Sequence, residues 1–159
     1  MNIDTILNDF HQTNNIGEET INHIKNDPEL RAALVNYFKQ QHDREFAIKL
    51  LDTFIEIRKQ PNGDMPAEDL MLASYILGLH GHIEDCLKIW EAKYADFDTY
   101  CGFDTQLVMF AGLHETIQFL ETQTNDPAQK ALEYIKEWFS PDPEELAEYF
   151  SPQTKLWFI

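Results

Sequence analysis

Apolar residues recur at intervals of three and four along most of this chain, and this spacing restricts the fold more than any other feature. Phe46, Leu50, Phe54 and Ile57 form one such row, which an α-helix would bring to a single face. Further rows are Ala47–Leu51–Ile55, Ile83–Leu87–Trp90–Tyr94, Leu113–Ile117–Leu120 and Ala128–Leu132–Ile135–Phe139. Two neighbouring rows within 46–57 indicate a helix that is buried on a broad face.

Three Asp-Pro pairs, at 27–28, 126–127 and 142–143, are typical of helix starts. In each pair the Asp can accept a hydrogen bond from the free amides of the first turn, and Pro suits the first helical position. "PNGDMP" at 61–66 is a strong break. No segment alternates apolar and polar residues as a strand would. We therefore expect seven to nine short helices and more than about 60% helix, against roughly one-third in an average globular protein.

This pattern predicts an all-α fold, with residues 1–159 as a single all-helical domain of antiparallel helical hairpins. The hairpins could stack as a short solenoid of tetratricopeptide-repeat (TPR) or HEAT character, or pack as an irregular bundle. The length is sufficient for a sizeable core. The residues that we expect to be most buried are Leu51, Phe54, Leu87, Trp90, Leu120 and Ile135.

The net charge is strongly negative, at −16 from 28 acidic and 12 basic residues, while 43% hydrophobic residues indicate a folded protein. This charge repels the phosphates of nucleic acids and anionic lipid headgroups, and it accelerates encounters with a basic protein. We expect a protein partner, and neither nucleic acid nor membrane. The alternative is that the charge serves solubility alone.

The remaining signals fit a reducing cytoplasm. "MNIDTILNDFHQTNN" at the N-terminus lacks the pattern of a signal peptide, and no run of apolar residues is long enough for a membrane helix. Cys86 and Cys101 form no CxxC pair, and both thiols are expected to pack as small apolar groups.

The stretch "ADFDTYCGFDTQ" at 95–106 raises the question of a calcium loop. Asp96 and Asp98 would occupy the first and third positions of such a loop. Tyr100, Cys101 and Leu107 then stand where a ligand, the invariant Gly and the final Glu are needed. The pattern favours a connector between two helices over a metal site.

As a connector, the stretch offers carboxylates at both of its ends. Asp104 is placed to cap the helix that follows, and Asp96 or Asp98 can hold the turn that leaves the preceding helix. Phe97 and Phe103 would then pack inward.

No catalytic constellation is evident in this chain. "HGHIEDC" at 80–86 gathers possible zinc ligands, but its two histidines straddle Gly81 at a turn and lack the spacing of an HExxH site. Phosphate-binding loops, nucleophile elbows and CxxC pairs are missing from the sequence. We therefore expect a protein that is not an enzyme and that needs neither a metal nor a cofactor.

The segment "SPQTKLWFI" contains four apolar residues, Leu156 to Ile159, that would form a sticky patch if exposed. They can dock on the neighbouring "EELAEYF" helix, or they can form a subunit contact.

"GHIEDCLKIW" resembles the second helix of a TPR unit. Gly81 takes the place of the turn glycine, Cys86 that of the small residue where helices touch, and Trp90 that of the large apolar residue. Ser74 stands where the first helix of the motif usually has Gly. The resemblance implies a helical hairpin.

Leu77 to Gly112, with the acidic and helical character of the rest, is similar to small acidic bacterial proteins, in particular the immunity proteins of interbacterial toxin systems, including contact-dependent growth inhibition. This resemblance implies a cytoplasmic protein that binds and neutralises a cognate toxin by masking its active surface. Many such toxins are basic nucleases. Because immunity proteins share no common motif, the resemblance assigns no residue.

Candidate contacts are the acids that neither cap a predicted helix nor face the predicted core. They are Asp64, Glu68, Asp69, Glu84, Asp85, Glu91, Asp96 and Asp98. Each could equally be a solvated surface charge. The alternative function is a TPR-like scaffold that holds a peptide or protein partner in a concave groove.

Overall fold

The computed structural model describes residues 1–139 and 141–159, which form ten α-helices and two 3₁₀-helices. They are α1 (Ile3–Thr13), α2 (Glu18–Asn26), α3 (Pro28–Phe38), α4 (Arg44–Lys59), α5 (Ala67–Gly78), η1 (Ile83–Asp85), α6 (Cys86–Lys93), α7 (Phe97–Gly102), η2 (Thr105–Met109), α8 (Leu113–Thr122), α9 (Asp126–Trp138) and α10 (Pro143–Tyr149). Helices hold 70% of the chain, and these two ranges contain no strand. The predicted all-α class is confirmed, although the chain divides into more helices than expected.

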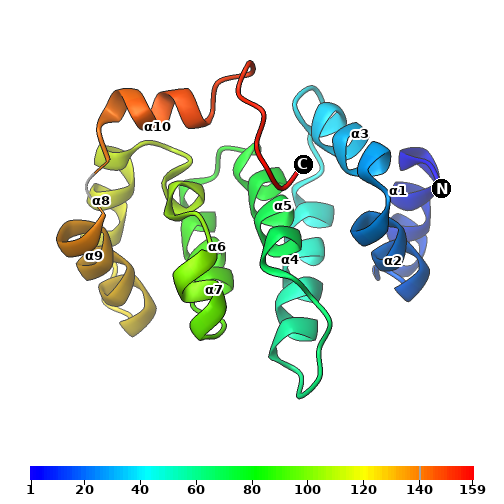
Figure 1. Cartoon of the computed structure of the whole chain (residues 1–159), viewed down its shortest axis with the longest axis horizontal. Coiled ribbons are helices and arrows are strands. Elements are labelled where there is room, and N and C mark those ends of the chain that lie inside the picture. The colour runs from blue at the N-terminus through cyan, green and yellow to red at the C-terminus, as the bar shows by residue number, and fades with distance from the viewer. Residues whose placement is uncertain (140) are drawn as a thin grey trace.

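The helices succeed one another in chain order across the molecule (Figure 1). α1–α3 lie at one end, α4 and α5 in the middle, then α6 and α7, and α8 and α9 at the other end. α4 and α5 form an antiparallel pair, as do α8 and α9. α10 crosses above α8, and the residues after it return toward α5 and α3. The arrangement is compatible with a solenoid of hairpins and with an irregular bundle.

Two of the three predicted Asp-Pro helix starts have the expected geometry. The Asp27 carboxylate accepts from the amide of Glu29 at 3.0 Å, and that of Asp142 accepts from the amide of Glu144 at 2.9 Å. The third start lies one residue earlier than predicted, because Asn125 caps α9 and Asp126 is already its first residue.

The core is centred on α4 and α5. Every residue from Leu70 to Leu77 is buried, as expected of a helix that is apolar on most sides and surrounded by others. Of the six residues expected in the core, Leu51, Phe54, Trp90, Leu120 and Ile135 are at most 2% exposed. Leu87 is only partly buried, because it lines an open groove between α6 and α9.

The residues after α10 form a strap that packs on the rest of the fold. Leu156 and Phe158 are buried, and the ring of Phe158 meets that of Tyr75 of α5 at 6.3 Å. The carbonyl oxygen of Phe158 accepts a hydrogen bond from Arg31 of α3 at 2.6 Å. Trp157 points outward between the two buried residues. The apolar segment therefore docks internally, over α5 rather than on α10 alone.

Asp104 holds this strap and does not cap a helix. It precedes η2, but its side chain makes no capping hydrogen bond. Its carboxylate instead accepts from the hydroxyl of Tyr149 at 2.8 Å and from Nε1 of Trp157 at 3.3 Å. Burial and the neighbouring Asp104 charge raise the pKa of the Tyr149 hydroxyl. The predicted capping role is wrong, because the partners of Asp104 come from the C-terminal region.

Replacing Asp104 with alanine should lower the free energy of unfolding by about 1–3 kcal/mol, because the hydroxyl of Tyr149 then lacks its partner at a part-buried site. Urea unfolding measures this loss. Adding Tyr149→Phe to the Asp104→Ala variant should recover part of it, since both polar partners are then gone. Asp98→Ala, which removes an exposed aspartate from the same connector, is the control and should cost less. Equal losses in the two single variants would contradict this role for Asp104.

Candidate functional site

The connector "ADFDTYCGFDTQ" contains a short helix, α7, whose start is fixed by a capping box. Asp96 precedes the helix, and its carboxylate accepts from the amide of Thr99 at 2.9 Å. The hydroxyl of Thr99 accepts in return from the amide of Asp96 at 3.0 Å. Two otherwise unsatisfied amides are thus paired. Asp96 therefore caps α7, a helix that was not expected within the connector, whereas the prediction was that Asp96 or Asp98 would hold the turn after the preceding helix.

Arg58, at the end of α4, attaches the start of α7 to the body of the protein. Its guanidinium donates from Nη2 to Asp96 at 3.0 Å and from Nη1 to the carbonyl oxygen of Met65 at 3.0 Å. The hydrogen bond from Arg58, followed by that from Thr99, lowers the pKa of Asp96 to about 2. Asp96 is therefore ionised throughout the physiological range.

Lys93 holds the other end of α7 by hydrogen bonds to two backbone carbonyl oxygens. It is 1% exposed, and its ammonium donates to the carbonyl oxygens of Tyr100 at 2.7 Å and Phe103 at 2.8 Å. The same nitrogen lies 5.5 Å from the ring centre of Tyr100 and 5.2 Å from that of Tyr134. Burial lowers the pKa of Lys93 to about 8. Together with Arg58, it fixes α7 at both ends.

Phe97, at the first position of α7, projects into solvent with 78% of its surface exposed. The side chains that are buried instead are those of Thr99 and Phe103, which lie four residues apart. The prediction is therefore correct for Phe103 and wrong for Phe97. The period of a helical turn, rather than an alternation of inward and outward residues, decides which side chain is buried.

A cluster of aromatic side chains joins the end of α6, α7 and α9. Tyr94 stacks on Trp90 with ring centres 5.5 Å apart, and it meets Tyr100 edge-on at 5.7 Å. Tyr134 of α9 closes the cluster against Tyr100, with ring centres 5.3 Å apart. Tyr94 remains 50% exposed. We call Tyr94, which ends α6, and Phe97 and Asp98, the first two residues of α7, the α7 face, since all three are exposed.

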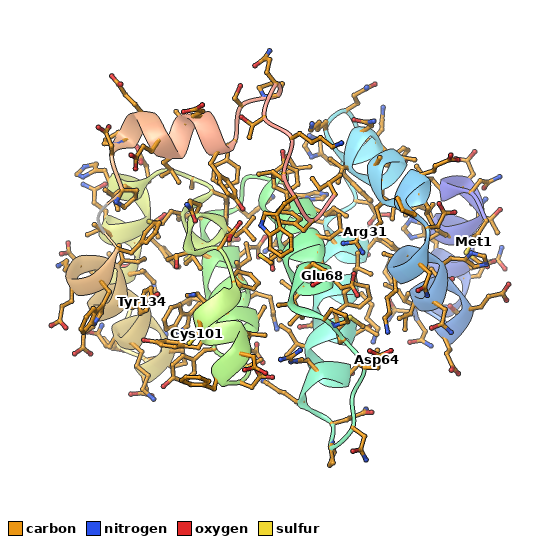
Figure 2. All side chains as sticks on the ribbon, viewed as in Figure 1. Met1, Arg31, Asp64, Glu68, Cys101 and Tyr134 are labelled. Carbon is orange, nitrogen blue, oxygen red and sulfur yellow. The ribbon has the colours of Figure 1, made fainter. Side chains whose placement is uncertain are left out.

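The two cysteines occupy different environments, whereas both were predicted to be packed. Cys86 is buried, and burial raises the pKa of its thiol to about 12. Cys101 is exposed on α7 (Figure 2), so its predicted packing is wrong.

Two of the eight candidate acids are buried and are therefore unavailable to a partner. Asp69 pairs with Arg31 inside the protein. Asp85 receives two hydrogen bonds from Arg44, at 2.6 and 2.9 Å. The prediction that these two are surface charges is wrong, because each neutralises an arginine from a helix far away in the sequence.

Four of the remaining acids are ion-paired at the surface. Glu84 lies 3.5 Å from Arg44, Glu91 lies 2.9 Å from Lys59, and Asp64 lies 2.8 Å from Lys25, while Asp96 binds Arg58 as described. Asp98 is 86% exposed at its side chain, with Arg58 at 3.9 Å, and Glu68 is also exposed.

The structure does not bring the eight acids together. Glu68 lies in the first turn of α5 and Asp64 in the loop before it, both away from Cys101 and Tyr134 (Figure 2), and Glu84 and Asp85 precede α6. Glu91, Asp96 and Asp98 are the three that adjoin the exposed aromatics. Sequence reasoning missed Phe97 and Lys93. A signal for Phe97 was present in "DFDT", since an Asp and a Thr three apart can form a capping box that makes Phe97 the first helical residue.

Comparisons with family models, with curated proteins and with solved structures find no match to this chain. In the described ranges, no three His, Cys, Asp or Glu side chains converge where they could ligate a metal ion. None of the described helices has the combination of length and apolar composition that a bilayer crossing requires.

Proposed function

We propose that this protein acts by binding another protein, as an immunity protein that neutralises a basic, nuclease-type toxin by masking its active surface. The α7 face is the observation that carries this proposal. It presents two exposed aromatic side chains, Tyr94 at the end of α6 and Phe97 on α7, together with the exposed carboxylate of Asp98, and aromatic residues are enriched in protein interfaces. Because Arg58 and Lys93 already hold α7 in place, little conformational freedom would be lost on binding.

The charge of the whole chain supports the same kind of partner. A net charge of −16 attracts a basic surface over the distance of a Debye length and raises the association rate. Masking a substrate groove requires contact and no chemistry, so the proposal includes no catalytic residue and no cofactor. Of the candidate acids, Asp98 contributes to toxin binding by direct contact. Glu91 and Asp96 contribute to it through the ion pairs that they already form within the protein.

Replacing Phe97 with alanine should weaken toxin binding by roughly 30-fold, since a truncated hot spot costs about 2 kcal/mol or more. Asp98→Lys should mainly slow association and reduce its dependence on salt. Surface plasmon resonance with the toxin domain encoded beside this gene, inactivated for purification, measures both effects at two salt concentrations. Co-expression with the active toxin tests whether protection of the cell falls in parallel.

Two variants serve as matched controls for this experiment. Trp138→Ala removes an equally exposed aromatic from α9, and Asp9→Lys reverses an exposed charge on α1. Both should bind the toxin as the wild type does. If Phe97→Ala and Trp138→Ala have the same affinity as the wild type, the interface lies elsewhere. If no toxin gene adjoins this one, the immunity proposal fails.

The second candidate function is a TPR-like scaffold, and the order of the helices favours it. Antiparallel pairs that follow one another in chain order are the architecture with which helical-repeat proteins bind peptides. A neighbouring toxin gene and protection of the cell would support immunity. Capture of a peptide without either would support the scaffold.

A further inference from the structure

Three of the six histidines gather around Asp43, which contacts both α1 and the residues after α5. Asp43 caps α4, because its Oδ1 accepts from the amide of Phe46 at 3.0 Å. Its Oδ2 lies 2.8 Å from Nε2 of His11 on α1, and its own backbone amide donates to Nε2 of His80 at 3.0 Å. His42, directly before Asp43, has its ring centre 5.4 Å from that of His80. We call this group the histidine junction.

Both ring nitrogens of His80 make contacts that only the neutral ring can satisfy. Nδ1 lies 2.9 Å from the carbonyl oxygen of Ile76, so Nδ1 carries the hydrogen atom that is donated to this oxygen. Nε2 faces the N–H of Asp43, so Nε2 is the acceptor and carries no hydrogen. A protonated imidazole has a hydrogen on both nitrogens. Protonation of His80 would therefore place two N–H groups against each other and break this contact.

The surroundings of His80 also oppose a positive charge on its ring. The ring packs on Phe38, with ring centres 5.6 Å apart. Burial lowers the pKa of His80, and the neighbouring His42 lowers it further, while the carbonyl oxygen of Ile76 and the charge of Asp43 oppose this shift. The titratable groups whose charges act on His80 are thus His42 and Asp43.

The other charged groups around the histidine junction pair with one another. The pairs are His11 with Asp43, Arg44 with Glu84 and with Asp85, and His82 with Glu84. Protonation of His11 would strengthen its contact with Asp43, because the hydrogen bond would then join two opposite charges. Acid therefore acts in opposite directions on the two histidines that contact Asp43, and it is at His80 that a hydrogen bond is lost.

We propose that the contact between His80 and Asp43 is an acid-sensitive switch, in which protonation of His80 releases the start of α4 and the α3–α4 connection from the end of α5. The neutral ring holds these segments together, and the protonated ring repels the Asp43 amide and a protonated His42. The histidine junction lies about 20 Å along α4 from Arg58, since a helix rises about 1.5 Å per residue. The switch depends on neither the α7 face nor the immunity proposal.

Nuclear magnetic resonance of the whole protein with isotope-labelled histidine tests the switch. At neutral pH, the imidazole nitrogens of His80 should show the hydrogen on Nδ1. As the pH falls, His80 should titrate below the ordinary pKa of 6.5, and the amide resonance of Asp43 should shift with the same midpoint. The protection of the Asp43 and Phe46 amides against hydrogen exchange should fall over this range, while protection in α8 and α9 should stay constant.

The pH dependence of stability provides a second measurement. Because the unfolded chain takes up the proton at a higher pH than the folded chain, the contribution of His80 to the free energy of unfolding should fall as the pH drops below 6.5. His80→Gln cannot be protonated, so subtracting its free energy of unfolding from that of the wild type at each pH isolates this loss. His42→Gln should raise the pKa of His80, because it removes the neighbouring positive charge.

The matched control is His114→Gln, the same change at an exposed histidine of α8. It should leave the titration of His80 and the response of the Asp43 amide unchanged. A hydrogen on Nε2 of His80 at neutral pH, a titration of His80 at or above 6.5, or an Asp43 amide that does not follow this titration would each overturn the proposal.

Discussion

Replacing Asp69 with alanine should lower the free energy of unfolding by about 3–5 kcal/mol. Asp69 is 2% exposed and pairs with Arg31, which is itself buried. Burial raises the pKa of Asp69, and the guanidinium of Arg31 opposes that rise. Without the carboxylate, the Arg31 charge stays buried and uncompensated, which costs far more than the loss of a surface ion pair. Urea unfolding followed by circular dichroism measures the change.

Arg31 connects several parts of the fold, so the effect should extend beyond the pair. It donates to the carbonyl oxygen of Ile24 at 3.3 Å and to that of Phe158 in the strap at 2.6 Å. The strap should therefore loosen, and the emission of Trp157 should shift before the helices unfold. Arg31→Met should have an effect of similar size, because it leaves Asp69 unpaired.

Glu121→Ala is the matched control, since it breaks an exposed pair with Lys136 at 2.6 Å. This substitution should cost no more than about 1 kcal/mol. The double variant Arg31→Met/Asp69→Leu should recover part of the loss, because no unpaired charge remains. If Asp69→Ala lowers the free energy of unfolding as little as Glu121→Ala does, the Arg31–Asp69 pair is open to water and does not support the fold.

Features that depend on neighbours in the sequence could be predicted. The rows of apolar residues predicted helices, because residues three and four apart meet on one face whatever the rest of the chain does. The caps formed by Asp27 and Asp142 could be predicted for the same reason, since each capping hydrogen bond joins residues two positions apart. The core positions of Leu51, Phe54 and Trp90 follow from these rows.

Features that depend on distant residues could not be predicted. The sequence predicts Asp69 and Asp85 as surface acids, but their arginine partners lie 38 and 41 positions away. It predicts Asp104 as a helix cap, but the partners of Asp104, Tyr149 and Trp157, lie 45 and 53 positions away. A carboxylate carries no local sign of whether it will be solvated or paired. Of the candidate site, the sequence therefore indicated the acidic connector but not which acids remain free.

Phe97 shows a third kind of limit. Its exposure follows from the start of a helix of only six residues, and a helix this short leaves no periodic pattern to detect. The pair of Asp96 and Thr99, three residues apart, was the only local sign of this helix start. A shift of two residues would have changed which aromatic side chain faces the core.

Replacing Lys93 with alanine should lower the free energy of unfolding by about 3 kcal/mol or more, through lost packing of a buried side chain and two carbonyl oxygens left without a donor. Because those carbonyls belong to Tyr100 and Phe103, the damage should be greatest at α7. Amide hydrogen exchange in residues 97–102 should accelerate more than in α4 or α5. Binding through the α7 face should weaken as well.

The pH dependence of stability offers a more specific test of Lys93. Burial lowers its pKa from the ordinary 10.5 to about 8 in the folded protein. Between these values the unfolded chain keeps a proton that the folded chain has released. Stability rises with pH wherever the unfolded state binds more protons. The contribution of Lys93 to the free energy of unfolding should therefore increase from pH 8 to pH 10.5 and be lost as the pH falls through 8.

Lys93→Met isolates this effect, because it keeps an unbranched apolar side chain and removes the titrating group. Subtracting its free energy of unfolding from that of the wild type at each pH removes the contributions of titratable groups that do not interact with Lys93. The difference should rise across the window from pH 8 to 10.5. A flat difference would mean that Lys93 keeps its ordinary pKa, and hence that its two carbonyl bonds and the rings of Tyr100 and Tyr134 compensate fully for the loss of water. In that case α7 would be held by a charge that stays in place at every physiological pH.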